Sequence, residues 1–289
     1  MKTPIFPNRA EQFYSRGDYF LGRNPIFNPF LLLEHPTALR KLYKKHPLLN
    51  YGMSYPNDLP SEEKSMKPDD RFSSQVRLLL NTVHKLGNVN GGHLLEVGSG
   101  TGCGAYLVDN TYHPASLNGV DYSPVQVARA KKLNRKKNNI HFHELSAADI
   151  ARQFGPEQFD GIYSVEMVQH LDQKTLQRFF EGAFTALKSE KKLSFCSFFS
   201  QNAEGQAELR KVFPTVDLGL DFMHNIEDIK QMLEQTGFKD IQTNSIGEYV
   251  WDQLIRWCNQ IAPEQTWSNA YLKVFPGLLD YYIVTGTKE

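Results

Sequence analysis

Cysteine is scarce in this sequence. The 289 residues include three cysteines, Cys103, Cys196 and Cys258, which are odd in number, far apart and without CxxC spacing. A disulfide framework or a structural zinc site needs paired or closely spaced thiols, so neither is expected here. We predict that the three cysteines are buried apolar side chains.

Net charge and long apolar runs are also lacking. Lys plus Arg and Asp plus Glu each number 32, so no overall field attracts nucleic acid or an anionic membrane. No apolar run approaches the roughly 18 residues of a membrane span, and the segment from Met1 to Pro7 lacks the apolar core of a signal peptide. We therefore expect a soluble, cytoplasmic protein that binds neither nucleic acid nor membranes.

The first part of the chain is rich in aromatic residues and proline. Ten Phe or Tyr residues fall within the first 60 positions without a sustained period, which predicts short helices and loops. A polar run at residues 56–70 then indicates a linker. We expect residues 1–70 to form a helical or loop lid segment and residues 71–289 to form an α/β domain.

From residue 71 onward, strand and helix patterns alternate. Ser123 followed by Pro124 marks one helix start, with Ser123 as the N-cap. Alternation of this kind predicts an open α/β sheet. The expected strands are 93–97, 117–121, 140–144, 159–165, 192–199, one after residue 238, and 279–287. One helix is expected from residue 71 onward, and a glycine loop with a helix at 98–110. The other expected helices are 124–134, 172–188, 226–235 and 248–261.

A glycine-rich loop follows the first of these strands. Gly98, Gly100 and Gly102 stand at alternate positions, which keeps side chains away from a ligand at the turn where such sheets bind ligands. Glu96 precedes the loop and would face a ligand ammonium group. Asp121 ends the next strand, 19 residues after Gly102, where a carboxylate can bind ribose hydroxyls. The combination predicts a nucleoside-binding site.

A dinucleotide site has a similar pattern, which leaves a nicotinamide-dependent oxidoreductase as an alternative. The dinucleotide fingerprint has a small third residue where Cys103 stands, and Glu96 would lie unfavourably close to a pyrophosphate. An amino acid moiety suits these residues better.

Three stretches carry a family resemblance. Residues 94–102 (Leu-Leu-Glu-Val-Gly-Ser-Gly-Thr-Gly), residues 119–130 and residues 159–171 resemble the motifs of class I S-adenosylmethionine-dependent methyltransferases. The resemblance implies a Rossmann-like, seven-stranded, mostly parallel sheet with an antiparallel last strand. Leu49 to Met53 resembles the Asn-Tyr-Gly-aromatic segment with which sterol, tocopherol and natural-product enzymes cover the cofactor, with Met53 in place of the aromatic residue.

The same resemblance implies a set of cofactor contacts. Glu96 would bind the methionine amino group, Asp121 the ribose, and Tyr122 would pack on the adenine. Ser146 stands where the family often has an Asp that reaches the adenine amine. Tyr51 is expected near the positively charged sulfonium. The full set is Tyr51, Glu96, Gly98, Ser99, Gly100, Gly102, Asp121, Tyr122, Ser146, Ala147 and Glu166.

Glu166 and His170 are the candidate catalytic residues. They lie four residues apart after the fourth strand, so a helical turn would place both side chains on one face. His170 can act as a general base near neutral pH, with a purely structural histidine as the equal alternative. Some relatives have an acid in the fifth strand where Ser197 stands, so the motif gives no His–Asp pair.

Other polar and aromatic patterns have simpler explanations. His141 and His143 alternate on one strand but lack a third ligand, so we expect a solvent-facing strand edge and no metal. The basic run at 131–137 lies at a helix end, where cations complement the helix dipole. Three tryptophans are candidates for an acceptor pocket or for the core: Trp251, Trp257 and Trp267.

The sequence therefore predicts a methyltransferase for a small, largely apolar metabolite. It would use S-adenosylmethionine to methylate an oxygen, carbon or nitrogen atom and release S-adenosylhomocysteine. The lid and residues 201–225 would enclose the site and exclude water. A homodimer is compatible with the sequence. Methylation of a protein or nucleic acid, and cofactor binding without turnover, stay as alternatives.

Overall fold

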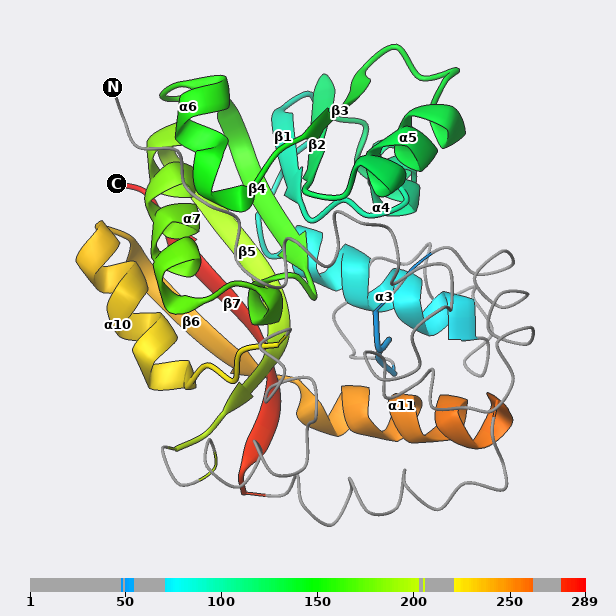
Figure 1. Ribbon diagram of the computed structural model, residues 1–289, viewed down its shortest axis with the longest axis vertical. Helices are drawn as coiled ribbons and strands as arrows, with labels where there is room; N and C mark the ends of the chain where they lie inside the picture. The colour runs from blue at the N-terminus through cyan, green and yellow to red at the C-terminus, as the bar shows by residue number, and fades with distance from the viewer. Residues whose placement is uncertain (1–47, 49, 55–70, 203–204, 206–220, 262–276) are drawn as a thin grey trace.

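A seven-stranded sheet forms the centre of the structure (Figure 1). The computed structural model describes residues 48, 50–54, 71–202, 205, 221–261 and 277–289. The strands lie in the order β3-β2-β1-β4-β5-β7-β6, and β7 runs antiparallel to both β5 and β6. The predicted sheet is confirmed. Its strands are β1 (His93–Val97), β2 (Ser116–Asp121), β3 (Ile140–Glu144), β4 (Phe159–Val165), β5 (Leu187–Ser200), β6 (Lys239–Ser245) and β7 (Leu279–Thr287).

Helices cover both faces of this sheet. In Figure 1, α6, α7 and α10 lie on one side, and α3, α4, α5 and α11 lie on the other. The helices are α3 (Arg71–His84), α4 (Cys103–Tyr112), α5 (Pro124–Leu133), α6 (Ile150–Phe154), α7 (Gln173–Ala186), α10 (Ile226–Thr236) and α11 (Gly247–Ile261).

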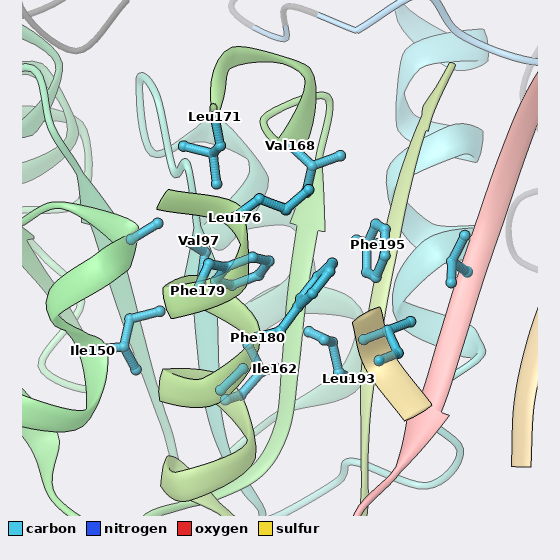
Figure 2. Packing of buried hydrophobic residues seen from close by; sticks show 14 of the residues in the cluster. Val97, Ile150, Ile162, Val168, Leu171, Leu176, Phe179, Phe180, Leu193 and Phe195 are labelled. Carbon is cyan, nitrogen blue, oxygen red and sulfur yellow. The ribbon is translucent and has the colours of Figure 1, made fainter. Parts of the chain in front are cut away.

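Helix α7 has a capped start and a buried apolar face that packs on the sheet. Asp172 caps its start by accepting a hydrogen bond from the Thr175 amide at 2.7 Å. Its buried residues Leu176, Phe179 and Phe180 recur at helical spacing and therefore share one face. Figure 2 shows this face turned toward the sheet, where the two phenylalanine rings meet side chains of β4 and β5.

The fifth strand begins earlier than predicted. The expected boundary at residue 192 is wrong, because β5 starts at Leu187, directly after α7. A register shift in its pairing with β4 and a positive φ of 63° at Glu190 accommodate the early start. The helix accordingly ends at Ala186 and not at residue 188.

Several of the predicted segments and residues lie wholly or partly outside the described residues. Of the predicted lid, residues 48 and 50–54 are described; of the predicted wall at 201–225, residues 201, 202, 205 and 221–225 are. Cys103 and Cys196 are free and buried as predicted, whereas the side chain of Cys258 lies outside the described part. Among the described helices, none combines the length and apolarity needed to cross a bilayer.

Candidate active site

A cavity opens at the carboxyl ends of β1, β2 and β4. Strand order reverses between β1 and β4, and ligands of open α/β sheets bind at such a switch point. Three predicted site residues, Tyr51, Gly102 and Ser146, are not among the residues that line it. The predicted residues that do line it are Glu96, Gly98, Ser99, Gly100, Asp121, Tyr122, Ala147, Glu166 and His170.

Two glycines of the loop serve different purposes. Gly98 has a φ of 79°, and a Cβ atom there would lie 2.6 Å from the side chain of Met167. Gly102 has a φ of 74° and faces away from the cavity, where a Cβ would lie 2.7 Å from Ala130 and 2.8 Å from Phe142. Gly98 thus lets the Met167 side chain pack against the loop at the cavity wall, while Gly102 permits close packing of α5 and β3 behind the loop.

Asp121 is held at the end of β2 by the loop itself. Its Oδ2 accepts a hydrogen bond from the Gly100 amide at 2.8 Å, and its Oδ1 accepts one from the Ser123 amide at 2.8 Å. Burial raises the pKa of this carboxyl, and the two amides and the nearby His170 partly offset that effect. The carboxylate is therefore oriented toward the cavity before any ligand binds.

Glu96 is a buried acid with an unsatisfied oxygen. Its side chain lies at the cavity, and its Oε2 has no hydrogen-bond partner among the described residues. Burial, aided by the negative charge of Asp121, raises the pKa of Glu96 to about 8; Tyr163 and the Ala105 amide act in the opposite direction. A buried carboxyl of this kind needs a cationic partner to ionise fully, so the site fits an ammonium group.

The helical turn predicted for Glu166 and His170 is wrong. Glu166 adopts a positive φ of 50°, and a short 3₁₀ helix, η5, covers only Val168–His170. The two side chains nevertheless line the same cavity, because the left-handed residue turns the chain as it leaves β4.

Glu166 links the cavity to the described residues of the predicted lid, 50–54. Its Oε1 accepts hydrogen bonds from the Tyr51 amide at 2.7 Å and from the Tyr281 hydroxyl at 2.8 Å. The Tyr51 ring stacks on Phe198 with a centroid separation of 6.1 Å and lies 6.4 Å from Trp251. These four rings, Tyr51, Phe198, Trp251 and Tyr281, are called the aromatic cluster below.

The segment that carries Tyr51 is fixed to α3. The side-chain carboxamide nitrogen of Gln75 donates to the backbone carbonyls of Leu48 and Asn50 at 2.8 and 2.7 Å. Arg77 donates to the Met53 carbonyl at 2.9 Å, and the Met53 side chain is buried. Met53 thus occupies the place of the family's aromatic residue as a core side chain.

The remaining predicted residues lie at the edge of the site or away from it. Ser146 caps a short 3₁₀ helix by accepting a hydrogen bond from the Ala148 amide at 3.3 Å, so its hydroxyl is already engaged. His141 is exposed on β3 at the sheet edge, and His143 contacts Asn118 at 3.0 Å. Within the described ranges, no three His, Cys, Asp or Glu side chains converge as metal ligands. The side chain of Trp257 and the whole of Trp267 lie outside the described part of the structure.

Sequence reasoning missed one acidic residue of the site. Asp221 Oδ1 lies 2.7 Å from His170 Nδ1, although the two residues are far apart in the sequence. Asp221 belongs to no motif or periodic pattern, and its position depends on how residues 221–225 return to η5. No sequence signal marks it.

Comparison with known proteins decides the family. Residues 94–190 match a family model described as a methyltransferase domain. O-methyltransferase rstn1 of Aspergillus nomiae is 28% identical over 177 residues, which cover 59% of this chain and 74% of that protein. Residues 94–190 therefore form a methyltransferase domain, and the findings support a class I S-adenosylmethionine-dependent methyltransferase in place of the nicotinamide-dependent alternative.

Other proteins that resemble this methyltransferase in sequence or in fold are also methyltransferases. Erythromycin 3''-O-methyltransferase of Saccharopolyspora erythraea is 37% identical over 101 residues, which cover 34% of this chain and 32% of that protein. The fold is shared with geranyl diphosphate C-methyltransferase from Streptomyces coelicolor A3(2), with a TM-score of 0.73 at 11% identity over 99% of this chain and 100% of that chain. That crystal structure contains S-adenosyl-L-homocysteine.

Proposed function

We propose that this methyltransferase transfers a methyl group to a small, largely apolar metabolite. One observation carries the proposal: a single cavity is lined by Glu96, Asp121 and His170. These side chains provide an ammonium-binding acid, a ribose-binding acid and a base within one site.

The chain's own residues would hold the cofactor from three strand ends. Glu96 would bind the methionine ammonium, and Asp121 the ribose hydroxyls. Tyr122 and the Ala147 amide would border the adenine, since both line the cavity. Bound S-adenosylmethionine supplies a methyl group already activated by its sulfonium.

The acceptor would lie beside His170 in this cavity. The cavity lining includes the apolar side chains of Val165, Met167 and Leu171, which supports a largely apolar acceptor. The aromatic cluster would hold Glu166 from behind the cavity wall, because its two tyrosines donate hydrogen bonds to that carboxylate. Much of the rate would come from alignment, with His170 removing a proton where the acceptor has one to lose. Several curated relatives are named O-methyltransferases, so a hydroxyl is the first acceptor group to test.

The balance of charge supports one further expectation. With 32 basic and 32 acidic side chains, the chain has no net charge that would favour a nucleic-acid partner. A cytoplasmic location and a homodimer stay predictions from the sequence.

Calorimetric titration of S-adenosylmethionine and S-adenosylhomocysteine tests the cofactor site. We expect micromolar binding by the wild type, binding weakened at least about tenfold in Asp121→Ala because a charged hydrogen-bond acceptor is lost, and unchanged binding in the control Asp252→Ala. Asp252 is exposed on α11. Absence of binding by a wild type that melts normally would contradict the proposal.

A protein that binds the cofactor without transferring its methyl group is the second candidate. The cyclase SpnF shares the fold, with a TM-score of 0.65 at 17% identity over 99% of both chains, so the fold alone does not establish methyl transfer. Mass spectrometry of an acceptor panel, with formation of S-adenosylhomocysteine as a second readout, separates the two candidates.

A further inference from the structure

His170 has a polar neighbour at each ring nitrogen. Asp221 Oδ1 lies 2.7 Å from Nδ1, and the carboxamide nitrogen of Gln169 lies 3.5 Å from Nε2. The contact with the carboxylate is short, although the ring N–H and the oxygen are not aligned as a hydrogen bond, and the contact with the carboxamide is long. An acceptor hydroxyl could therefore displace the carboxamide more easily than the carboxylate.

The orientation of Gln169 is fixed from behind by β5. Both Gln169 and Ser197 are buried, and the Ser197 hydroxyl donates to Gln169 Oε1 at 2.8 Å. The carboxamide nitrogen is thereby turned toward His170. An N–H donor beside Nε2 favours a lone pair there, while a carboxylate beside Nδ1 favours a proton there. Both neighbours favour the same neutral tautomer, with the proton on Nδ1.

Asp221 belongs to a segment that is docked firmly on η5. The Phe222 amide donates to the Gln169 carbonyl at 2.6 Å, and His224 Nε2 lies 2.8 Å from the Leu171 carbonyl oxygen. These contacts place Asp221 beside the imidazole independently of its own side chain. The carboxylate itself is 17% exposed, so water screens the pair only in part.

We propose that Asp221 is the positioning residue that holds His170 with its proton on Nδ1, so that Nε2 accepts the proton of the methyl acceptor. This role rests on the proposed function, because it requires an acceptor that loses a proton. The acceptor's O–H or N–H bond breaks, its proton moves to Nε2, and its electron pair forms the new bond to the methyl carbon. The C–S electron pair stays on sulfur, and the imidazolium that results is stabilised by Asp221.

Other charged groups also surround His170 and stay in place when Asp221 is altered. Glu96, Asp121 and Glu166 line the same cavity from β1, β2 and the end of β4. Asp172 caps α7 nearby, and His224 lies on the same docked segment as Asp221. A change confined to the Asp221 carboxylate therefore isolates its effect from theirs.

The decisive measurement is the titration of His170 by NMR in the ligand-free protein labelled at histidine Cε1. The signal is assigned by its absence in His170→Gln. In Asp221→Asn the pKa of His170 is expected to fall by about one unit, because the carboxylate that stabilises the imidazolium is gone. Asp221→Glu is expected to recover part of the shift. The control Asp240→Asn removes an exposed carboxylate on β6 and should leave the titration unchanged. An unchanged His170 titration in folded Asp221→Asn would overturn the proposal.

A long-range ¹H–¹⁵N spectrum of the wild type needs no variant and reports the tautomer directly. A neutral His170 protonated on Nδ1 supports the proposal, and one protonated on Nε2 overturns it. Both NMR readouts are independent of turnover, so failure of the proposed function would leave them interpretable. With an acceptor in hand, Asp221→Asn should lower kcat by about 10- to 100-fold and move the acidic limb of its pH profile to lower pH.

Discussion

At the scale of single residues, the burial of Glu96 makes the stability of the fold depend on pH. Its pKa of about 8 lies far above the ordinary value of 4.5, so the folded, ligand-free protein favours the protonated acid. A group whose pKa is raised by folding stabilises the fold fully below its unfolded pKa and loses that contribution as the pH rises through its folded value. The ligand-free protein should therefore lose stability from about pH 5 to pH 8 through this side chain.

We predict that Glu96→Gln melts at a higher temperature than the wild type at pH 8 but binds S-adenosylmethionine more weakly. The amide stays neutral at every pH. The two proteins should therefore differ little in unfolding free energy at pH 5 and by a few kcal/mol at pH 8, and the difference in melting temperature should grow in the same direction. Differential scanning calorimetry across this range measures it. The control Glu234→Gln alters an exposed residue of α10. If the Glu96→Gln and wild-type curves run parallel, the raised pKa is refuted.

The site residues that the sequence predicts lie in regular elements, whereas those that it does not predict are brought to the site by tertiary contacts. Glu96 and Asp121 are fixed by strand ends and by spacing, and both were predicted at the cavity that they line. Asp221 reaches His170 through a segment with no regular pattern, and Ser197 acts through Gln169. Local sequence contains no information about such tertiary neighbours.

At the scale of elements, α3 positions the segment at 50–54. The buried Gln75 side chain donates to the backbone carbonyls of Leu48 and Asn50. The Tyr51 backbone amide donates to Glu166. The helix thus supports one wall of the cavity, and its Leu79 also lines that cavity.

Replacing Gln75 with alanine should therefore release this segment. Two buried carbonyls would lose their donor, at a cost of about 1–3 kcal/mol for each unsatisfied group. Hydrogen-exchange mass spectrometry should show faster exchange at residues 50–54, with a lower melting temperature. Gln158→Ala, which removes an exposed local hydrogen bond to Pro156, is the matched control. Unaltered exchange at 50–54 would show that other contacts hold the segment.

Periodicity predicted most elements but not the turns between them. Strands β1, β3, β4 and β7 have the predicted bounds, since apolar runs bounded by turn residues mark buried strands. The chain after β4 was predicted as a helical turn, whereas the left-handed Glu166 leads into η5. A non-glycine residue in this conformation is held by tertiary contacts, here with Tyr51 and Tyr281, and spacing alone does not reveal it.

At the scale of the whole molecule, a ligand that binds only the folded state raises the melting temperature. S-adenosylhomocysteine at 100 times its Kd should add about 2.7 kcal/mol of stability, which corresponds to roughly 5 °C for a chain of this size. Thermal melting of the wild type and Asp121→Ala at one fixed ligand concentration tests this. An equal rise in both proteins would place the ligand somewhere other than the Asp121 cavity.

The position of β7 in the sheet also dictates an order of assembly. Strand β6 lies at one edge and pairs with β7, which follows it in the chain and separates it from β5. A nascent polypeptide on the ribosome therefore displays β5 with an open, apolar border until β7 has been translated. During that interval the unfinished sheet is a natural client for a chaperone, and a premature stop codon just before residue 279 would leave β6 without its link to β5.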